Sequence, residues 1–265
     1  MRIARFSHDG DVSFGVVEGP GEDPADLVVA KALGHPFAPL QLTGESVPLT
    51  AVRLLAPVLP SKVVCIGKNY ADHIAEMGND PALGAPPPAT PVVFLKPSTS
   101  VVGPGDAIVL PRDSDEVDHE AELVIVIGRL CRDVPRERAL DVVLGYTCGN
   151  DVTARDHQRQ DGQWARGKSH DTFCPLGPWV ETELNPSDLG VRCTVDGALR
   201  QDGRTADLIH DVPAIIAWVT AFMTLLPGDV IMTGTPAGVG PLSAGGLVSV
   251  AIEGLGTLTN PVVGR

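Results

Sequence analysis

The segment His119–Ile127 constrains the fold of this chain more than any other. It reads His-Glu-Ala-Glu-Leu-Val-Ile-Val-Ile, and Gly128 follows it. A short run of aliphatic and β-branched residues that stops at a glycine predicts a strand that enters the core. We therefore expect a fold organised around a sheet.

The composition favours strands and tight turns over long helices. The 265 residues include 29 glycines and 24 prolines, whereas aromatic residues make up only 4%. Glycine and proline in such numbers are typical of many short elements joined by turns. We predict a β-dominated α+β fold with few helices, large enough to bury a sizeable core.

Prolines divide the chain into two predicted domains. Residues 1–56 predict a small β-rich N-terminal domain, which ends where Pro57 and Pro60 interrupt the chain, and residues 57–265 predict the larger domain. The predicted strands are Arg2–Phe6, Val12–Val17, Leu27–Val29 and Val52–Leu55 in the first domain, and Lys62–Gly67, Pro91–Lys96, Ala107–Leu110, His119–Ile127, Leu144–Asp151, Val191–Val195, Asp229–Met232 and Leu247–Ile252 in the second.

Helical patterns are short, with one exception. Val212–Leu226 is the one long amphipathic segment, and Pro227-Gly228 ends it. Asn69–Met77 and Pro135–Asp141 predict one or two turns each. The Pro- and Ala-rich stretch Asn79–Pro91 lacks periodicity and predicts a loop, so the helix before it is a candidate for a mobile lid.

Charge and cysteine content argue against several classes of protein. The net charge of −13 opposes binding to nucleic acid, which needs a basic surface. The five cysteines are widely spaced without a Cys-x-x-Cys, which argues against a disulfide framework or a zinc cluster and favours reduced thiols. No apolar run is long enough to span a membrane, and the first residues lack a signal-peptide pattern. We expect a soluble, cytoplasmic protein.

Three carboxylates are candidates for a metal site. Glu120 and Glu122 stand two residues apart in a predicted strand, so they project from the same face. Side by side at the mouth of a core strand they would repel each other and lose hydration, which a hard divalent cation would relieve. Asp151 closes another predicted strand and would complete the oxygen triad. Taken alone, the glutamates fit a solvated strand end better, and Asn150-Asp151 equally fits an Asx turn in a polar loop.

A histidine and a glutamate form a candidate catalytic pair. His73 and Glu76 lie three residues apart, on one face of the predicted short helix. Histidine is the usual general base near neutral pH, and a neighbouring carboxylate holds its tautomer and raises its basicity. Such a pair would activate water. A lone histidine on a short helix is more often a surface or core residue, so this interpretation depends on the other motifs.

Further polar residues suit an anionic substrate. Arg155 and Gln158 follow the third carboxylate, and a guanidinium can pair bidentately with a substrate carboxylate. Lys168 offers a point charge. The glycine-rich turn Thr233–Gly240 lacks the Gly-Lys-Ser/Thr ending of a phosphate-binding loop, but its amides and Thr235 could line an anion pocket.

In this order, the segments resemble the fumarylacetoacetate hydrolase family, closest to its acylpyruvase-like and 2-hydroxyhepta-2,4-diene-1,7-dioate isomerase-like branch. The resemblance spans residues 62–262 and is carried by Val64–His73, Phe94–Ser98, His119–Glu122, Asn150–Asp156, Gly167–Ser169 and Thr233–Gly240. As an ordered set these motifs are highly specific, although no single one is. One departure is Gly245-Gly246-Leu247, where the family usually carries Gly-Asp; it lies at a turn, so we expect no catalytic effect.

The resemblance implies a mixed β-sandwich roll, commonly assembled as a homodimer. It implies Mg²⁺ or Mn²⁺ bound by Glu120, Glu122 and Asp151, although Ca²⁺ accepts the same oxygen ligands. It also implies a lid that carries the histidine–glutamate pair and closes over a small 2-oxo or diketo acid. The residues implied for catalysis are His73, Glu76 and Lys168, and those implied for binding substrate are Lys96, Arg155, Gln158 and Thr235.

The expected chemistry rests on an enolate. A metal that chelates the carboxylate and 2-oxygen of the substrate would stabilise negative charge on it. The leading hypothesis is a hydrolase that cleaves a carbon–carbon bond in acylpyruvates or fumarylpyruvate-like diketo acids. The alternative keeps the enolate but leads to isomerisation of 5-carboxymethyl-2-hydroxymuconate-type dienoates or to decarboxylation, as of oxaloacetate. A minor alternative is a non-catalytic protein that binds metal or ligand.

Overall fold

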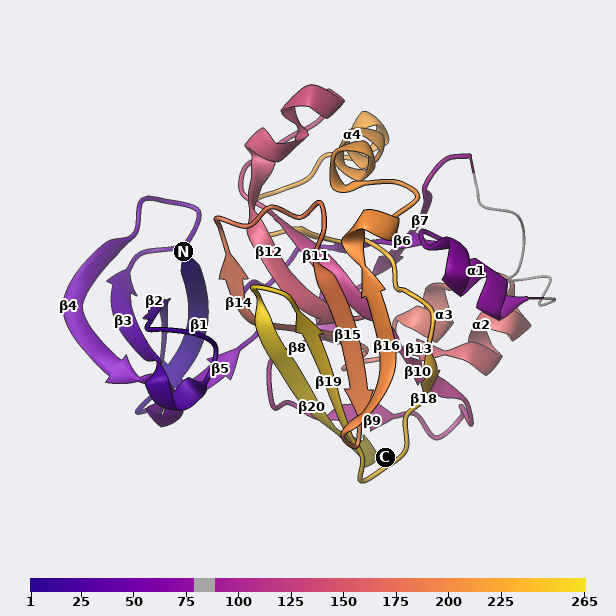
Figure 1. Cartoon of the computed structure of the whole chain (residues 1–265), viewed down its shortest axis with the longest axis horizontal. Coiled ribbons are helices and arrows are strands. Elements are labelled where there is room, and N and C mark those ends of the chain that lie inside the picture. The colour runs from indigo at the N-terminus through magenta and orange to yellow at the C-terminus, as the bar shows by residue number, and fades with distance from the viewer. Residues whose placement is uncertain (79–88) are drawn as a thin grey trace.

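The computed structural model describes residues 1–78 and 89–265, and strands dominate it (Figure 1). The β-dominated α+β fold expected from the sequence is therefore confirmed. Most of the predicted loop Asn79–Pro91 lies outside the described residues. No helix within the described ranges is long and apolar enough to cross a membrane.

A 12-stranded sheet runs through the whole molecule and forms its framework. Its strands in spatial order are β4 (Gln41–Pro48), β3 (Val28–Leu33), β2 (Asp11–Glu18), β1 (Arg2–His8), β14 (Cys174–Glu181), β12 (Val143–Asn150), β11 (Ala121–Ile127), β17 (Val230–Met232), β6 (Val63–Gly67) and β7 (Val92–Lys96), with β5 (Arg53–Leu55) beside β1 and β8 (Val101–Val102) beside β14.

Two smaller sheets complete the architecture. One contains β13 (Thr153–Ala154), β10 (Val117–His119) and β18 (Gly240–Pro241), and the other contains β16 (Ala198–Arg204), β15 (Gly190–Val195), β19 (Leu247–Ile252), β20 (Gly256–Gly264) and β9 (Ile108–Leu110). The five-stranded sheet packs on the main sheet, where β15 contacts β11, β19 contacts β12 and β20 contacts β14. This layering is the sandwich that the resemblance implies.

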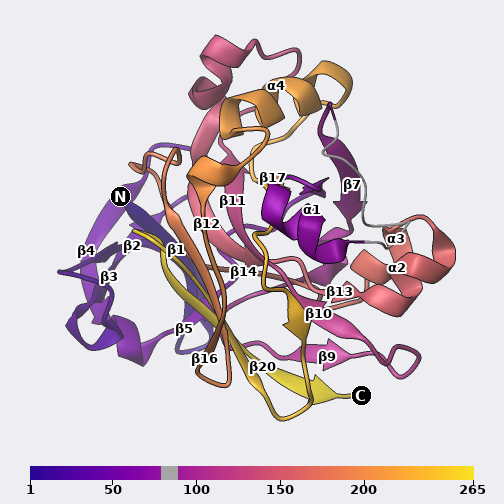
Figure 2. The same ribbon diagram turned by 45° about the vertical axis from the view of Figure 1, so that its right-hand side comes forward.

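The α-helices are α1 (Ala71–Met77), α2 (Arg155–Asp161), α3 (Ala165–Lys168) and α4 (Val212–Phe222). Single 3₁₀ turns lie at Pro24–Asp26, Leu49–Ala51, Ser98–Ser100 and Thr205–Asp207, and a longer 3₁₀ helix spans Arg136–Val142. Helices α1, α2 and α3 gather on the same side of the molecule in both views (Figures 1 and 2). This side carries the candidate functional site.

Strand β11 is apolar without alternation because its side chains pack into a core on both faces of the sheet. Leu123, Ile125 and Ile127 join the core cluster shared with the five-stranded sheet, whereas Val124 and Val126 join a second cluster with β6, β14 and β17. Both faces are covered, so every residue of the strand is buried. Full burial of one aliphatic side chain contributes about 1.5–3 kcal/mol to the stability of the fold. Because every residue of β11 is buried, this strand lies at the centre of the core.

The N-terminal strands have a small core of their own. Phe6, Leu27 and Leu49 pack there together with Trp179, which β14 contributes. Pairing of β1 with β14 then joins this region to the rest of the sheet. Strand β4 was not predicted, because nearly all of its side chains are exposed and its sequence shows no apolar alternation.

The long predicted helix Val212–Leu226 is shorter in the structure. Helix α4 ends at Phe222, because Met223 has extended dihedral angles and Leu225 forms a β-bridge with Cys131. The predicted helix Pro135–Asp141 is the 3₁₀ helix Arg136–Val142. Local periodicity could not reveal the bridge, since its partner lies far away in the sequence.

Several strands and helices lacked a sequence pattern that would have predicted them. Strand β14 contains Pro175, Gly177 and Pro178, which disguise a strand that is buried along almost its whole length. Strands β16 and β20 were also missed, as were α2 and α3, which begin directly in the polar motifs at Arg155 and Ala165. Polar residues that face a site break the amphipathic pattern on which such predictions depend.

Candidate metal centre and active site

Three buried carboxylates converge at one end of β11. Glu120 lies in the break between β10 and β11, so the strand predicted as continuous is interrupted there, and Glu122 follows in β11. Asp151 comes directly after β12, and its amide donates to the Glu120 carbonyl at 2.9 Å. Oxygens of the three side chains lie within 4.8 Å of one another, and none is more than 4% exposed. We call this set the acidic cluster.

Three cations neutralise part of the acidic cluster. Lys168 Nζ donates to Glu120 Oε2 at 2.8 Å and to Asp151 Oδ2 at 2.7 Å, and Lys96 Nζ ion-pairs with Asp151 Oδ1. Arg155 Nη2 lies 2.7 Å from Glu120 Oε1. Burial alone would raise the pKa of Glu120, but the charges of Lys168 and Arg155 outweigh it and lower that pKa.

Glu122 is in a different electrostatic position. Its Oε2 accepts a hydrogen bond from the Gly234 amide at 2.7 Å, and no cation among the described residues forms an ion pair with it. Burial raises its pKa well above the usual value, and the charges of Asp151 and Glu120 raise it further. A buried carboxylate left in this state is unfavourable unless a cation joins it. The donor set is therefore chemically suited to a hard divalent cation.

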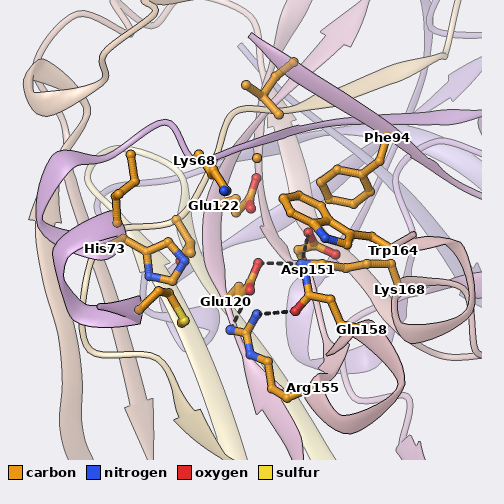
Figure 3. Close-up of a pocket in the computed structure, with 15 residues that line it drawn as sticks. Lys68, His73, Phe94, Glu120, Glu122, Asp151, Arg155, Gln158, Trp164 and Lys168 are labelled. Atoms are coloured by element: carbon orange, nitrogen blue, oxygen red, sulfur yellow. Dashed lines mark hydrogen bonds and ion pairs between the residues drawn. The ribbon is translucent and has the colours of Figure 1, made fainter. Parts of the chain in front are cut away.

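Helix α1 holds the predicted catalytic pair over the acidic cluster. It begins at Ala71, two residues later than predicted, because Tyr70 is extended. His73 Nδ1 lies 3.3 Å from Glu76 Oε2, and both Glu76 oxygens accept from the Gly238 amide, at 3.0 and 3.1 Å. Partial burial raises the pKa of Glu76, but these hydrogen bonds, with His73 first, lower it overall. The imidazole faces the acidic cluster (Figure 3).

The pocket above the acidic cluster brings most predicted site residues together. It is lined by Ile66, Gly67, Lys68, His73, Ile74, Met77, Phe94, Glu120, Glu122, Asp151, Arg155, Gln158, Trp164, Lys168 and Thr235 (Figure 3). Residues from β6, α1, β7, α2 and α3 thus meet over one end of β11. Such a concave site with converging charges is typical of an enzyme pocket.

Comparison with known proteins decides the family. Residues 62–263 match the model of the fumarylacetoacetate hydrolase C-terminal domain. The chain belongs to the fumarylacetoacetate hydrolase family. Residues 1–57 match a second model, the Rv2993c-like N-terminal family. The resemblance inferred from the motifs is thereby confirmed, and members of this family generally bind divalent metals.

Similar proteins within the fumarylacetoacetate hydrolase family carry several names. "Protein Rv2993c" of Mycobacterium tuberculosis is 55% identical over 99% of this chain and 98% of its own length. The mitochondrial "oxaloacetate tautomerase fahd2" of Xenopus laevis is 46% identical over 80% of this chain and 69% of its own. The crystal structure of 2-hydroxyhepta-2,4-diene-1,7-dioate isomerase from Mycobacterium marinum superposes with a TM-score of 0.92, at 52% identity over 100% and 99% of the two chains.

Lys96 and Arg155, which the resemblance implies as substrate contacts, form ion pairs and hydrogen bonds within the protein. Lys96 does not line the pocket: its amino group lies beneath Asp151 and also donates to the Val152 carbonyl at 3.1 Å. Arg155 lines the pocket, but Nε donates to Asp118 at 2.8 Å and Nη1 to Gln158 Oε1 at 3.1 Å. Lys96 thus balances the charge of Asp151, and Arg155 is held by Asp118 and Gln158, while their contacts with substrate stay predictions.

Gln201, which no sequence motif indicates, supports the site from β16. Its Oε1 accepts from the Ala121 amide at 3.0 Å, and its Nε2 donates to Thr235 Oγ1 at 2.7 Å and to the Pro236 carbonyl at 2.8 Å. Thr235 in turn donates to the Ala121 carbonyl at 2.9 Å. Gln201 thus fixes Thr235 against β11. No motif surrounds Gln201, so only the fold reveals this role.

Proposed function

We propose that this chain is a divalent-cation-dependent enzyme that shifts a proton on the carbon next to the 2-oxo group of a small 2-oxo acid, an isomerisation or tautomerisation. One observation carries the proposal: the His73–Glu76 pair faces a buried, incompletely neutralised acidic cluster. The names of similar proteins, an isomerase and a tautomerase, support the same choice.

Glu120, Glu122 and Asp151 would hold Mg²⁺ or Mn²⁺. When bound, the cation would withdraw electron density from the 2-oxo group and so make the neighbouring carbon acidic. Lys168 would keep positive charge beside the developing oxyanion, because its ammonium already lies between two carboxylates of the acidic cluster. Gln158 Oε1 accepts from Arg155, which leaves the Gln158 amide nitrogen as a donor for the substrate carboxylate.

His73 would carry the proton. Its Nδ1 faces Glu76, so the carboxylate favours the tautomer with hydrogen on Nδ1 and leaves Nε2 free to take a proton from substrate. The same imidazole would return the proton at another atom. Helix α1, held by the contact of Glu76 with Gly238, covers the reacting atoms and excludes water.

Hydrolysis of acylpyruvates or fumarylpyruvate-like acids, the first expectation from the sequence, becomes the second candidate. The His73–Glu76 pair is also suited to activating a water molecule, which would attack the distal carbonyl. Decarboxylation of oxaloacetate needs no activated water and shares the enolate.

The homodimer and the cytoplasmic location stay predictions, as does the boundary between the two domains at residues 56 and 57.

The proposal is tested by product analysis. The purified protein with Mg²⁺ or Mn²⁺ is incubated in D₂O with 2-hydroxyhepta-2,4-diene-1,7-dioate, oxaloacetate and acetylpyruvate, and products are identified by NMR. A shifted double bond or deuterium at C3, without carbon–carbon cleavage and above the rate of Glu122→Ala, supports the proposal. Pyruvate and acetate from acetylpyruvate would favour the hydrolase instead, and CO₂ released from oxaloacetate would favour the decarboxylase. If no substrate were turned over and none exchanged hydrogen faster than with Glu122→Ala, both the isomerase and the hydrolase would be overturned.

A further inference from the structure

Two helices carry the polar side chains on one flank of the pocket. Arg155 and Gln158 come from α2, Lys168 is the last residue of α3, and all three line the pocket (Figure 3). The two helices contact each other, and a Cβ at Gly167 would lie only 3.0 Å from the Gln158 amide nitrogen. The position of Gln158 relative to Lys168 therefore depends on how α2 and α3 are held together.

A pair of histidines joins α2 to the segment that follows α3. The side chain of His157, beside Gln158 in α2, is 3% exposed, and His170 is half-buried two residues after Lys168. His157 Nδ1 lies 3.1 Å from His170 Nε2, and the His170 ring also packs against Phe173. Neither imidazole is among the groups that line the pocket. The pair can therefore affect the site only through the helices it joins.

The outer nitrogen of His157 determines which ring donates in this pair. His157 Nε2 lies 2.7 Å from the Asp113 carbonyl oxygen, which can only accept, so Nε2 carries a hydrogen. In the neutral imidazole Nδ1 then has a lone pair, and His170 Nε2 donates to it. One added proton keeps this hydrogen bond, because it can reside on His170 Nδ1. A second proton breaks it, because both facing nitrogens would then carry a hydrogen.

The surroundings of the pair oppose a second charge. Burial lowers the pKa of His170 below its usual value, and the charge of His157 lowers it further. In the unfolded chain both rings titrate near pH 6.5. The contribution of the pair to stability is therefore complete above about pH 6.5 and is lost as the pH falls below it. The charged groups that act on the pair are Asp113 before β10, Asp156 and Asp161 in α2, Arg166 in α3 and Lys96 in β7.

We propose that His157 and His170 are positioning residues that hold Gln158 and Lys168 at a fixed separation, and that acid releases this hold. The inference rests on the proposed function, in which Gln158 donates to the substrate carboxylate and Lys168 faces the developing oxyanion. When both imidazoles are charged they repel each other, and α2 is no longer tied to the segment after α3. The pocket then loses affinity for a 2-oxo acid.

A purely structural role for the two rings makes a different prediction. If they only fill space, the double variant His157→Leu/His170→Phe should bind ligand with the same pH dependence as wild type. If they form a pH-sensitive link, the double variant should lose the part of the pH dependence that the link causes. His73 and the acidic cluster are present in both proteins, so their titration cancels in the comparison.

The test measures the dissociation constant of pyruvate by calorimetry at saturating Mg²⁺, at pH 7.5 and at pH 5.5. Between the two pH values, wild-type protein should lose about tenfold more affinity than the double variant, the scale of one lost hydrogen bond. His170→Gln should behave like the double variant, because its amide can donate to a neutral imidazole or accept from a charged one. His8→Gln in strand β1 should behave as wild type.

The outcomes separate this inference from the proposed function. An equal loss of affinity in wild type and double variant would overturn the role of the pair and leave the proposed function intact. If the double variant failed to fold, the same comparison with His170→Gln would decide.

If the wild-type protein did not bind pyruvate at pH 7.5, the proposed function would fail, and nitrogen NMR of the ligand-free protein would still test the link. At pH 7.5 the spectrum should show a hydrogen on His157 Nε2 and none on His157 Nδ1. The spectrum at pH 5.5 should show the facing nitrogens separated, each with a hydrogen. Unchanged spectra between the two pH values would overturn the acid release.

Discussion

The acidic cluster and helix α1, the predicted lid, face each other across one pocket but are built in opposite ways. The cluster rests on β11 and β12, is almost completely buried, and is tied down by ion pairs from Lys96, Lys168 and Arg155. In α1 only Ile74 is buried, and Glu76 secures the helix through its contact with the Gly238 amide.

The difference separates two tasks that an enzyme of this kind must perform. A cation site needs ligands that do not move, which buried strands and ion pairs provide. Under the proposed function, the helix that covers the pocket must also let substrate in and product out, which a short, mostly exposed helix permits. Changes in the cluster should therefore alter the global free energy of unfolding and cation binding, whereas changes in α1 should alter activity and, at most, the local stability of the helix.

The largest expected effect is on the lid. His73→Ala should lower kcat about 10³-fold, equivalent to about 4 kcal/mol, because general acid–base groups contribute on this scale. The free energy of unfolding should fall by about 1 kcal/mol or less, because Ile74 is the one buried residue of α1, although the His73 side chain is 12% exposed. Steady-state kinetics and urea denaturation check both values, with Asp72→Ala on the same helix as the matched control. A large loss of stability would break the contrast.

A change beneath the acidic cluster should act on stability first. Lys96→Met removes a buried partner of Asp151, and breaking a buried ion pair in this way costs about 3 kcal/mol. Urea denaturation without added metal should detect the loss, and Lys31→Met at the surface should change little. If Lys96→Met were as stable as wild type, the ion pair with Asp151 would not hold the acidic cluster in place, and the contrast with α1 would fail.

Addition of the cation should stabilise the folded protein through the acidic cluster and independently of His73 in α1. At 100 times its dissociation constant, a cation that binds only the folded state adds about 2.7 kcal/mol, which a chelator should reverse. The gain should persist in His73→Ala and disappear in Glu122→Ala. Thermal unfolding with Mg²⁺ and with EDTA measures it, and equal melting temperatures for the wild type in the two conditions would contradict the assignment of the three ligands.

The smallest effect concerns the pH dependence of the lid. The folded state lowers the pKa of Glu76, so the contribution of its contacts is present above the unfolded pKa and is lost as pH falls through the folded one. Because solvent screens this partly exposed group, the effect should be about 1 kcal/mol or less. Hydrogen exchange of the α1 amides should quicken below the usual glutamate range, after correction for intrinsic rates. In Glu76→Gln the protection should be low and independent of pH.

Much of the fold could be predicted because the informative patterns are local. Strand β11 was recognisable from its apolar run, and the family from six short motifs in order. Strand β14 and the end of α4 were not, because prolines hide the first and a distant β-bridge determines the second. Local sequence does not contain the contact that stops a helix.

For the site, the chain itself determines which side chains can act and which share a strand face. The two-residue period of a strand predicts that Glu120 and Glu122 share a face, as they do although the strand is interrupted at Glu120, and the helical period does the same for His73 and Glu76. These relations hold in any fold that preserves the elements.

Only the tertiary structure decided what surrounds those side chains. The pairing of Ala121 with Asn150 brings Asp151 to the glutamates, and burial then raises the pKa of Glu122 while neighbouring cations lower that of Glu120. The structure also placed Lys96 beneath the cluster and Lys68 in the pocket. Register, burial and charge pairing depend on residues far apart in the chain, so the motifs identified the chemical groups and the fold assigned their roles.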